Sequence, residues 1–69
     1  MNIQIKQIAE RLRALRESLE LTQEKAAEKC GVPTEEYQQY ESGEYDIPMS
    51  FICQAADTFG IDTTALLVG

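Results

Sequence analysis

The sequence predicts an all-α protein, a compact bundle of five short helices. Apolar residues recur at spacings of three and four in two long segments, which is the period of an amphipathic helix. Glycine or proline stands between most of these segments, and no stretch shows the alternation that is typical of a β-strand. The 69 residues suffice for one domain with one hydrophobic core. We expect helices over residues 3–19, 22–30, 34–42, 48–59 and 62–67.

The first helix is indicated by a stripe of branched apolar residues with charged residues between them. At spacings of three and four, these residues share one helical face. Glu20 follows the stripe, and if it ends the helix in the left-handed conformation it costs about 1 kcal/mol relative to glycine. The stripe consists of Ile5, Ile8, Leu12, Leu15 and Leu19.

Two short helical patterns joined by a tight turn follow. The hydroxyl of Thr22 can cap the second helix, and Gly31 can end it in the left-handed conformation. Pro33 suits the start of the third helix, in which Tyr37 and Tyr40 take inward positions. A helix, a glycine turn and a steeply inclined second helix form a helix-turn-helix.

The last two helices complete the bundle. Pro48 can open the fourth helix, whose buried stripe is Met49, Ile52, Ala56 and Phe59, and Gly60 ends it. Asp62 can cap the short final helix. The predicted core consists of Ile8, Leu12, Leu15, Leu21, Ala26, Val32, Tyr37, Tyr40, Ile52, Ala56, Phe59, Ile61 and Leu66.

The chain is acidic, with a formal net charge of −6 and a pI near 4.4. Residues 1–29 hold all six basic residues against five acidic ones, for a net charge of +1, and residues 30–69 hold seven acidic residues and no base, for −7. This balance runs against nucleic-acid binding, because Lys and Arg supply most of the non-specific affinity for phosphates. Cations for DNA are therefore expected only from the first two helices.

Several classes of chemistry are disfavoured. Cys30 and Cys53 lie in helical patterns without a secretory signal, so we expect free thiols. With two thiols and no histidine, a tetrahedral metal site lacks ligands, and no other cofactor is indicated. The acidic residues follow solvated helical faces, and no phosphate-binding glycine loop or nucleophile motif accompanies them, so we expect no enzyme and no catalytic residue. No apolar run approaches the roughly 20 residues of a membrane span, and a cytoplasmic protein is expected.

Several short motifs fall at the spacing of a known family. They are Thr22-Gln23, Ala26-Ala27, Gly31-Val32, Glu41 with Gly43, Pro48 and Phe59-Gly60-Ile61. On these residues the chain, over residues 1–69, resembles a helix-turn-helix domain of the phage-repressor/Cro type, also called the xenobiotic-response-element family. The resemblance implies a lambda-repressor-like bundle that binds a palindromic DNA operator as a homodimer. Small acidic domains of this type resemble those that precede a cupin-type sensor barrel.

The resemblance also implies roles for single residues. Residues 34–42 would form the recognition helix in the major groove, Gln23 would contact a phosphate, and Arg16 would pair with Glu41. Thr34 and Gln39 suit base readout, since threonine can contact a thymine methyl and glutamine can bond adenine. The expected DNA-binding set is Thr22, Gln23, Thr34, Glu35, Gln38, Gln39 and Ser42.

Two functions stay open at this point. The first is the sequence-specific DNA-binding domain of a prokaryotic transcriptional regulator. The second is a protein-interaction module on the same scaffold, because Glu35 and Glu36 give the recognition helix an acidic surface that suits a basic partner. These two carboxylates also suit the positive end of the helix dipole, which is a purely structural explanation for them.

Overall fold

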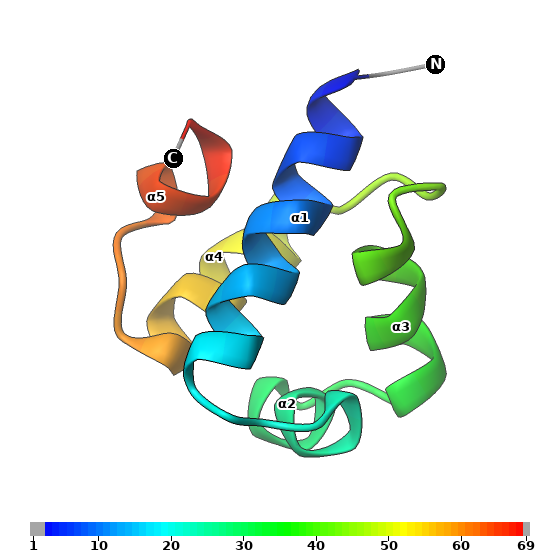
Figure 1. Cartoon of the computed structure of the whole chain (residues 1–69), viewed down its shortest axis with the longest axis vertical. Helices are drawn as coiled ribbons and strands as arrows, with labels where there is room; N and C mark the ends of the chain where they lie inside the picture. The colour runs from blue at the N-terminus through cyan, green and yellow to red at the C-terminus, as the bar shows by residue number, and fades with distance from the viewer. Residues whose placement is uncertain (1–2, 69) are drawn as a thin grey trace.

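The computed structural model describes residues 3–68, which form five α-helices and no strand (Figure 1). The helices are α1 (Ile3–Ser18), α2 (Gln23–Cys30), α3 (Thr34–Ser42), α4 (Met49–Phe59) and α5 (Thr63–Leu67). The predicted all-α class is confirmed, and each predicted helix is present with its ends within one residue of the expected positions. No helix in this part of the chain is long and apolar enough to cross a membrane.

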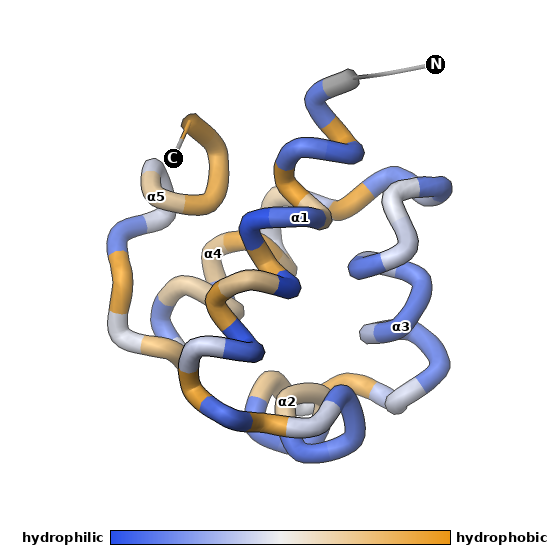
Figure 2. The backbone as a smooth tube through the Cα atoms, viewed as in Figure 1, coloured by the Kyte–Doolittle hydropathy of each residue, from blue (hydrophilic) through white to orange (hydrophobic). Residues whose placement is uncertain are grey.

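Helix α1 lies at the centre of the bundle. It packs against α3 on one side and α5 on the other, while α2 contacts both α3 and α4 (Figure 1). Along the backbone, α3 is mostly hydrophilic and α4 is mostly apolar (Figure 2). Both helices keep one face in solvent, and the buried face of α4 is apolar.

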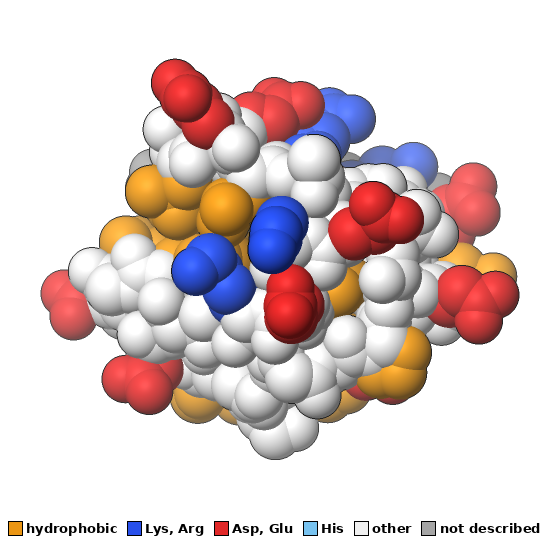
Figure 3. All heavy atoms as spheres, turned by 90° about the horizontal axis from the view of Figure 1, so that it is seen from below, with side chains coloured by type: hydrophobic (Ala, Val, Ile, Leu, Met, Phe, Trp, Pro, Cys, Tyr) orange, Lys and Arg blue, Asp and Glu red, His pale blue; other side chains and the backbone are white. Residues whose placement is uncertain are grey.

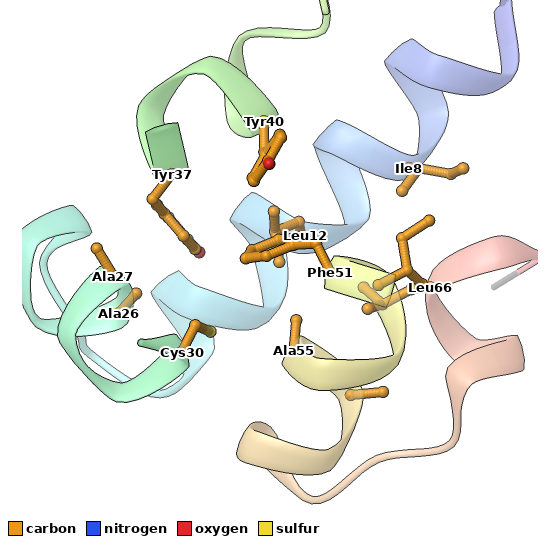
Figure 4. Packing of buried hydrophobic residues seen from close by; sticks show 12 residues of the cluster. Ile8, Leu12, Ala26, Ala27, Cys30, Tyr37, Tyr40, Phe51, Ala55 and Leu66 are labelled. Atoms are coloured by element: carbon orange, nitrogen blue, oxygen red, sulfur yellow. The ribbon is translucent and has the colours of Figure 1, made fainter. Parts of the chain in front are cut away.

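The core joins all five helices (Figure 4). Its centre is aromatic: the Phe51 ring lies 4.3 Å from the Tyr40 ring and 6.1 Å from the Tyr37 ring, measured between centroids. These contacts hold α3 against α4, and aromatic pairs of this kind add about 0.5–1.5 kcal/mol beyond their buried area. The buried apolar residues are Ile8, Ala9, Leu12, Ala26, Ala27, Cys30, Tyr37, Tyr40, Phe51, Ile52, Ala55, Ala56 and Leu66.

Two residues of the predicted apolar stripes, neither of them in the predicted core, are exposed, and the predicted core is incomplete in α4. Leu19 is 45% exposed because α1 ends at Ser18, and Met49 is 56% exposed in the first turn of α4. Phe51 and Ala55 are buried instead, which rotates the inward face of α4 away from the predicted one. The apolar residues of α4 form a broad arc opposite Ser50, Gln54, Asp57 and Thr58, so periodicity alone did not show which part of this arc is buried. Leu15, Leu21, Val32, Phe59 and Ile61, expected in the core, are only partly buried.

The helix ends follow the expected chemistry with one exception. Thr22 Oγ1 accepts a hydrogen bond of 3.1 Å from the Lys25 N–H, which confirms the predicted cap of α2. Glu20 adopts a left-handed backbone with φ of 59°, at the conformational cost expected of a non-glycine residue. Asp62 stands at the N-cap position of α5, but its side chain makes no capping bond, which corrects the prediction. Instead, a backbone hydrogen bond from the Ala65 N–H to the Asp62 carbonyl forms the first turn of the short α5.

Both cysteines are free, as expected. Cys30 is buried where α2 meets the core, and Cys53 is exposed on α4. Burial raises the pKa of the Cys30 thiol, and a hydrogen bond with Thr58 partly opposes this rise. Cys30 therefore acts as a small apolar side chain in the core.

Candidate nucleic-acid interface

Helices α2 and α3 form the helix-turn-helix. Gly31, in the left-handed conformation with φ of 76°, ends α2, and its N–H donates to the α2 carbonyls of Ala27 and Glu28. Ala26 and Ala27 are completely buried, so small side chains allow α2 to approach its neighbours closely. Tyr37 and Tyr40 point from α3 into the core (Figure 4), which leaves the opposite face of α3 to solvent.

The solvent-facing residues of this unit include most of the set predicted for DNA binding. Glu35, Gln38, Gln39 and Ser42 are exposed on α3, Thr34 is half-buried at its start, and Thr22 is exposed before α2. The Ser42 hydroxyl donates to the Gln39 carbonyl at 2.7 Å, so its proton is engaged within α3. The exposed face of α3 therefore offers two amide side chains and one carboxylate, with no cation.

Arg16 and Glu41 form the ion pair that was expected between α1 and α3. Arg16 Nε lies 2.7 Å from Glu41 Oε2, and Arg16 Nη2 lies 3.2 Å from Glu41 Oε1. The Glu41 side chain is 2% exposed and that of Arg16 is 12% exposed. Hydrogen bonding to Glu41 raises the pKa of Arg16 against the opposing effect of desolvation. The pair fixes the orientation of α3 on α1, because two nitrogens of Arg16 bind the two carboxylate oxygens of Glu41.

Gln23 is placed differently from its expected exposed position. Its side chain is half-buried, with Nε2 donating to Glu41 Oε1 at 3.0 Å and Oε1 accepting from Gln38 Nε2 at 3.3 Å. Gln23 thus joins the start of α2 to α3 at two points and orients the amide of Gln38. An amide nitrogen carries two hydrogens, so one of them is still able to donate outward.

The two acids at the start of α3 have different surroundings. Glu36 is half-buried, and its Oε2 accepts a hydrogen bond of 2.7 Å from the Tyr40 hydroxyl one helical turn later. Burial and then this bond raise the pKa of the Tyr40 phenol. Glu35 is exposed and makes no such bond in the described part of the chain. Glu36 therefore serves the fold, and Glu35 is the acid that faces any ligand of α3.

Arg11 has a structural role that the sequence pattern did not reveal. Its Nη1 donates to the carbonyls of Leu66 and Leu67 at 3.2 and 2.8 Å. A cation at the last carbonyls of a helix satisfies orphan acceptors and complements the helix dipole. Arg11 therefore fastens α5 to α1. Contacts from a side chain to distant backbone atoms leave no local pattern in a sequence.

Comparison with known proteins agrees with this architecture. A family model described as a helix-turn-helix domain matches residues 7–67. The chain therefore belongs to the helix-turn-helix domain family. No curated protein matches it in sequence.

Two solved structures are similar to the chain over nearly all of its length. The crystal structure of a hypothetical transcription factor, NHTF, from Neisseria has 25% sequence identity and a TM-score of 0.89, over 94% of this chain and 75% of that one. An HTH_3 family transcriptional regulator from Vibrio cholerae has 26% identity and a TM-score of 0.86, over 93% of this chain and 36% of that one. The chain thus spans about a third of the length of the second protein.

Proposed function

We propose that the chain is the sequence-specific DNA-binding domain of a prokaryotic transcriptional regulator of the Cro type, with α3 in the major groove. One observation carries the proposal. Tyr37, Tyr40 and Glu41 hold α3 against the bundle by its inner face, while the polar side chains on its outer face stay in solvent. A helix supported in this way can enter a groove without losing its own contacts.

The residues of α3 then take separate roles. Thr34 and Gln39 suit base edges, because threonine can contact a thymine methyl and glutamine can bond adenine. Gln38 joins them, because Gln23 holds its amide in one orientation. Gln23 keeps one N–H for a phosphate oxygen, and Thr22 and Ser42 lie at the two ends of the contact region. Glu35 is tolerated where it can accept from cytosine N4.

The operator is expected to be palindromic. In a homodimer, two copies of α3 would enter successive major grooves about 34 Å apart. Few cations are available, so a single domain should bind DNA weakly. An additional domain that joins two copies of the chain would raise the effective concentration of the second copy at its half-site. The longer chains of the two similar structures suit this arrangement, and a cupin-type sensor is our candidate for the additional domain.

A protein-interaction module is the alternative function. It is favoured by charge, since residues 30–69 contain seven acidic residues and no base. Seen from the side of α2, most acidic side chains stand toward the edge of the molecule, with basic ones near the middle (Figure 3). A basic partner could use Glu35 and its acidic neighbours on this scaffold.

Selection from a randomised DNA pool, at low and at physiological salt, distinguishes the two functions. DNA binding predicts an enriched palindrome. Gln39→Ala should relax preference at one position of each half-site, by about 1–3 kcal/mol, and Gln23→Ala should weaken binding to all sequences alike. A folded, dimeric protein that enriches no sequence at low salt would refute DNA recognition and favour the interaction module.

A further inference from the structure

Half of the basic residues are engaged in contacts within the chain. Arg11 is bound to the end of α5, Arg16 is bound to Glu41, and Lys25 lies 3.6 Å from the carboxylate of Glu28. Lys6, Arg13 and Lys29 make no ion pair or hydrogen bond within residues 3–68. A polyanion can meet these three cations without breaking a contact within the protein.

Two of the three unpaired cations line one groove. A hollow of about 150 Å³ lies between α1 and the carboxyl end of α3, lined by Lys6, Glu10 and Arg13 of α1 and by Glu41, Ser42 and Gly43. We call it the α1–α3 groove. Gly43 has no side chain to fill it: a Cβ there would lie 3.4 Å from Lys6 Cγ and 3.6 Å from Lys6 Cα. The backbone of α3 therefore ends directly against the Lys6 turn of α1.

The charges of the groove favour an anion. The carboxylate of Glu41 is neutralised by Arg16, which leaves the two cations against the single carboxylate of Glu10. Lys6 and Arg13 are seven residues apart, or about 10 Å along a helix axis, so each can meet a different phosphate of one strand. The loop after α3 carries Glu44 and Asp46 instead of basic residues, so cations on this side must come from α1.

The groove adjoins the proposed recognition surface. Ser42 belongs both to the groove and to the exposed face of α3. A major groove is about 12 Å wide, close to the diameter of a helix with its side chains, so a helix inside it has a phosphate backbone on each side. Gln23 lies at the start of α2 on one side of α3, and the α1–α3 groove lies at the carboxyl end of α3.

We infer that the α1–α3 groove is a second phosphate-binding site, at which Lys6 and Arg13 contact the DNA backbone beside the end of α3. This inference rests on the proposed DNA-binding function. It assigns the main cationic contact to α1, outside the helix-turn-helix, and it explains how an acidic chain can approach DNA.

The test measures how the affinity of the 69-residue chain for a mixed-sequence DNA duplex depends on salt, by fluorescence anisotropy. Lys6→Gln and Arg13→Gln should each reduce the slope of log K against log salt concentration by about 1, and the double variant by about 2. Lys29→Gln is the matched control, because it removes one unpaired cation that lines a different hollow beside Leu19 and Phe59. It should leave the slope within about 0.3 of the parent value.

The outcomes distinguish failure of the groove assignment from failure of the proposed DNA-binding function. If the parent chain binds DNA and all three single variants change the slope equally, only net charge matters and the groove is not a site. If the parent chain, which should bind weakly, binds no DNA at low salt even at the highest protein concentration, the proposed function fails and the groove assignment fails with it. A second measurement does not depend on the variants: in an NMR titration of the parent chain with the same duplex, the amides of Lys6, Arg13 and Gly43 should shift. Shifts confined to α2 and α3 would overturn the assignment.

Discussion

The guanidinium of Arg16 on α1 donates to both carboxylate oxygens of Glu41 on α3 and, through Nη1, to the Leu21 carbonyl at 2.8 Å. All three of its nitrogens are therefore engaged, and Glu41 is its almost fully buried partner. A single residue thus connects α1, the chain just before α2, and α3. Removing one member of such a pair leaves a buried charge with too few partners.

We expect Arg16→Ala to lower the free energy of unfolding by about 3–5 kcal/mol. Arg13→Ala, which removes an exposed cation from the same helix, should change it by less than about 0.5 kcal/mol. Urea unfolding followed by circular dichroism compares the two. Equal losses would show that the pair with Glu41 does not hold α3 in place.

Leu12 and Leu19 test which part of the apolar stripe on α1 supports the core. Leu12 is 2% exposed and Leu19 is 45% exposed. Leu12→Ala should lower the free energy of unfolding by about 2–5 kcal/mol, because it leaves a cavity in the core. Leu19→Ala should have an effect below about 1 kcal/mol. Thermal and urea unfolding of both variants provide the measurement, and a similar loss for both would contradict the assigned burial.

Tyr37 should make the protein sensitive to alkali. Burial and then the neighbouring carboxylate of Glu41 raise the pKa of its phenol well above the ordinary value, so the folded chain keeps a proton that the unfolded chain releases above about pH 10. Stability is therefore full below this pH and falls as pH rises beyond it. The raised pKa values of Tyr40 and Cys30 act in the same direction.

The corresponding variant is Tyr37→Phe. The buried Tyr37 hydroxyl has no hydrogen-bond partner in residues 3–68, so its removal should be nearly neutral or stabilising at pH 7. Unfolding curves between pH 7 and pH 11 should show a smaller alkaline loss in this variant. Tyr45→Phe, at a side chain that is 50% exposed, is the control and should leave the alkaline loss unchanged. If the stability of Tyr37→Phe followed that of the parent at every pH, the Tyr37 phenol would not be the source of the alkaline loss of stability.

Arg11 should control how firmly α5 is held. Arg11→Gln removes the charged donor from the carbonyls of Leu66 and Leu67, and hydrogen bonds to charged groups contribute about 1.5–3 kcal/mol. Hydrogen exchange at the amides of α5 should accelerate more than exchange at α2. Arg13→Gln should leave both rates unchanged, and uniform acceleration over all helices would indicate global instead of local loosening.

Glu35 should set the electrostatic cost of bringing α3 to DNA. Glu35→Gln removes an exposed charge without breaking a hydrogen bond, and it should strengthen non-specific DNA binding by relieving repulsion from phosphates. Glu36→Gln should strengthen binding less, because this half-buried side chain is held by the Tyr40 hydroxyl. Anisotropy at low salt measures both affinities, and weaker binding by Glu35→Gln would point to a specific contact through its carboxylate.

The sequence predicted the elements of the fold better than their contacts. Helix ends depend on local chemistry, so Thr22, Glu20 and the glycines marked them correctly. The buried face of α4 depends on its neighbours, and a broad apolar arc does not reveal which part of it they cover. Phe51 was therefore missed, although its ring contacts both tyrosines of α3.

The candidate site shows the same division. Arg16 and Glu41 were expected together only because of a family resemblance, since nothing in their local sequence links them. Both contacts of Gln23, to Glu41 and to Gln38, join residues at least 15 positions apart. Such contacts exist only once the helices are packed, so they could not be derived from spacing.

The residues that hold α3 against the bundle and the residues that α3 exposes to solvent are almost separate sets. Tyr37, Tyr40 and Glu41 face the bundle, whereas Glu35 and the exposed glutamines face outward. Substitutions on the outer face can therefore change what the helix recognises without unfolding the domain that carries it. Gln38 belongs to both sets, because it is exposed on α3 and is also bonded to Gln23 on α2. A substitution at this position that changes specificity would therefore also weaken the contact between α2 and α3.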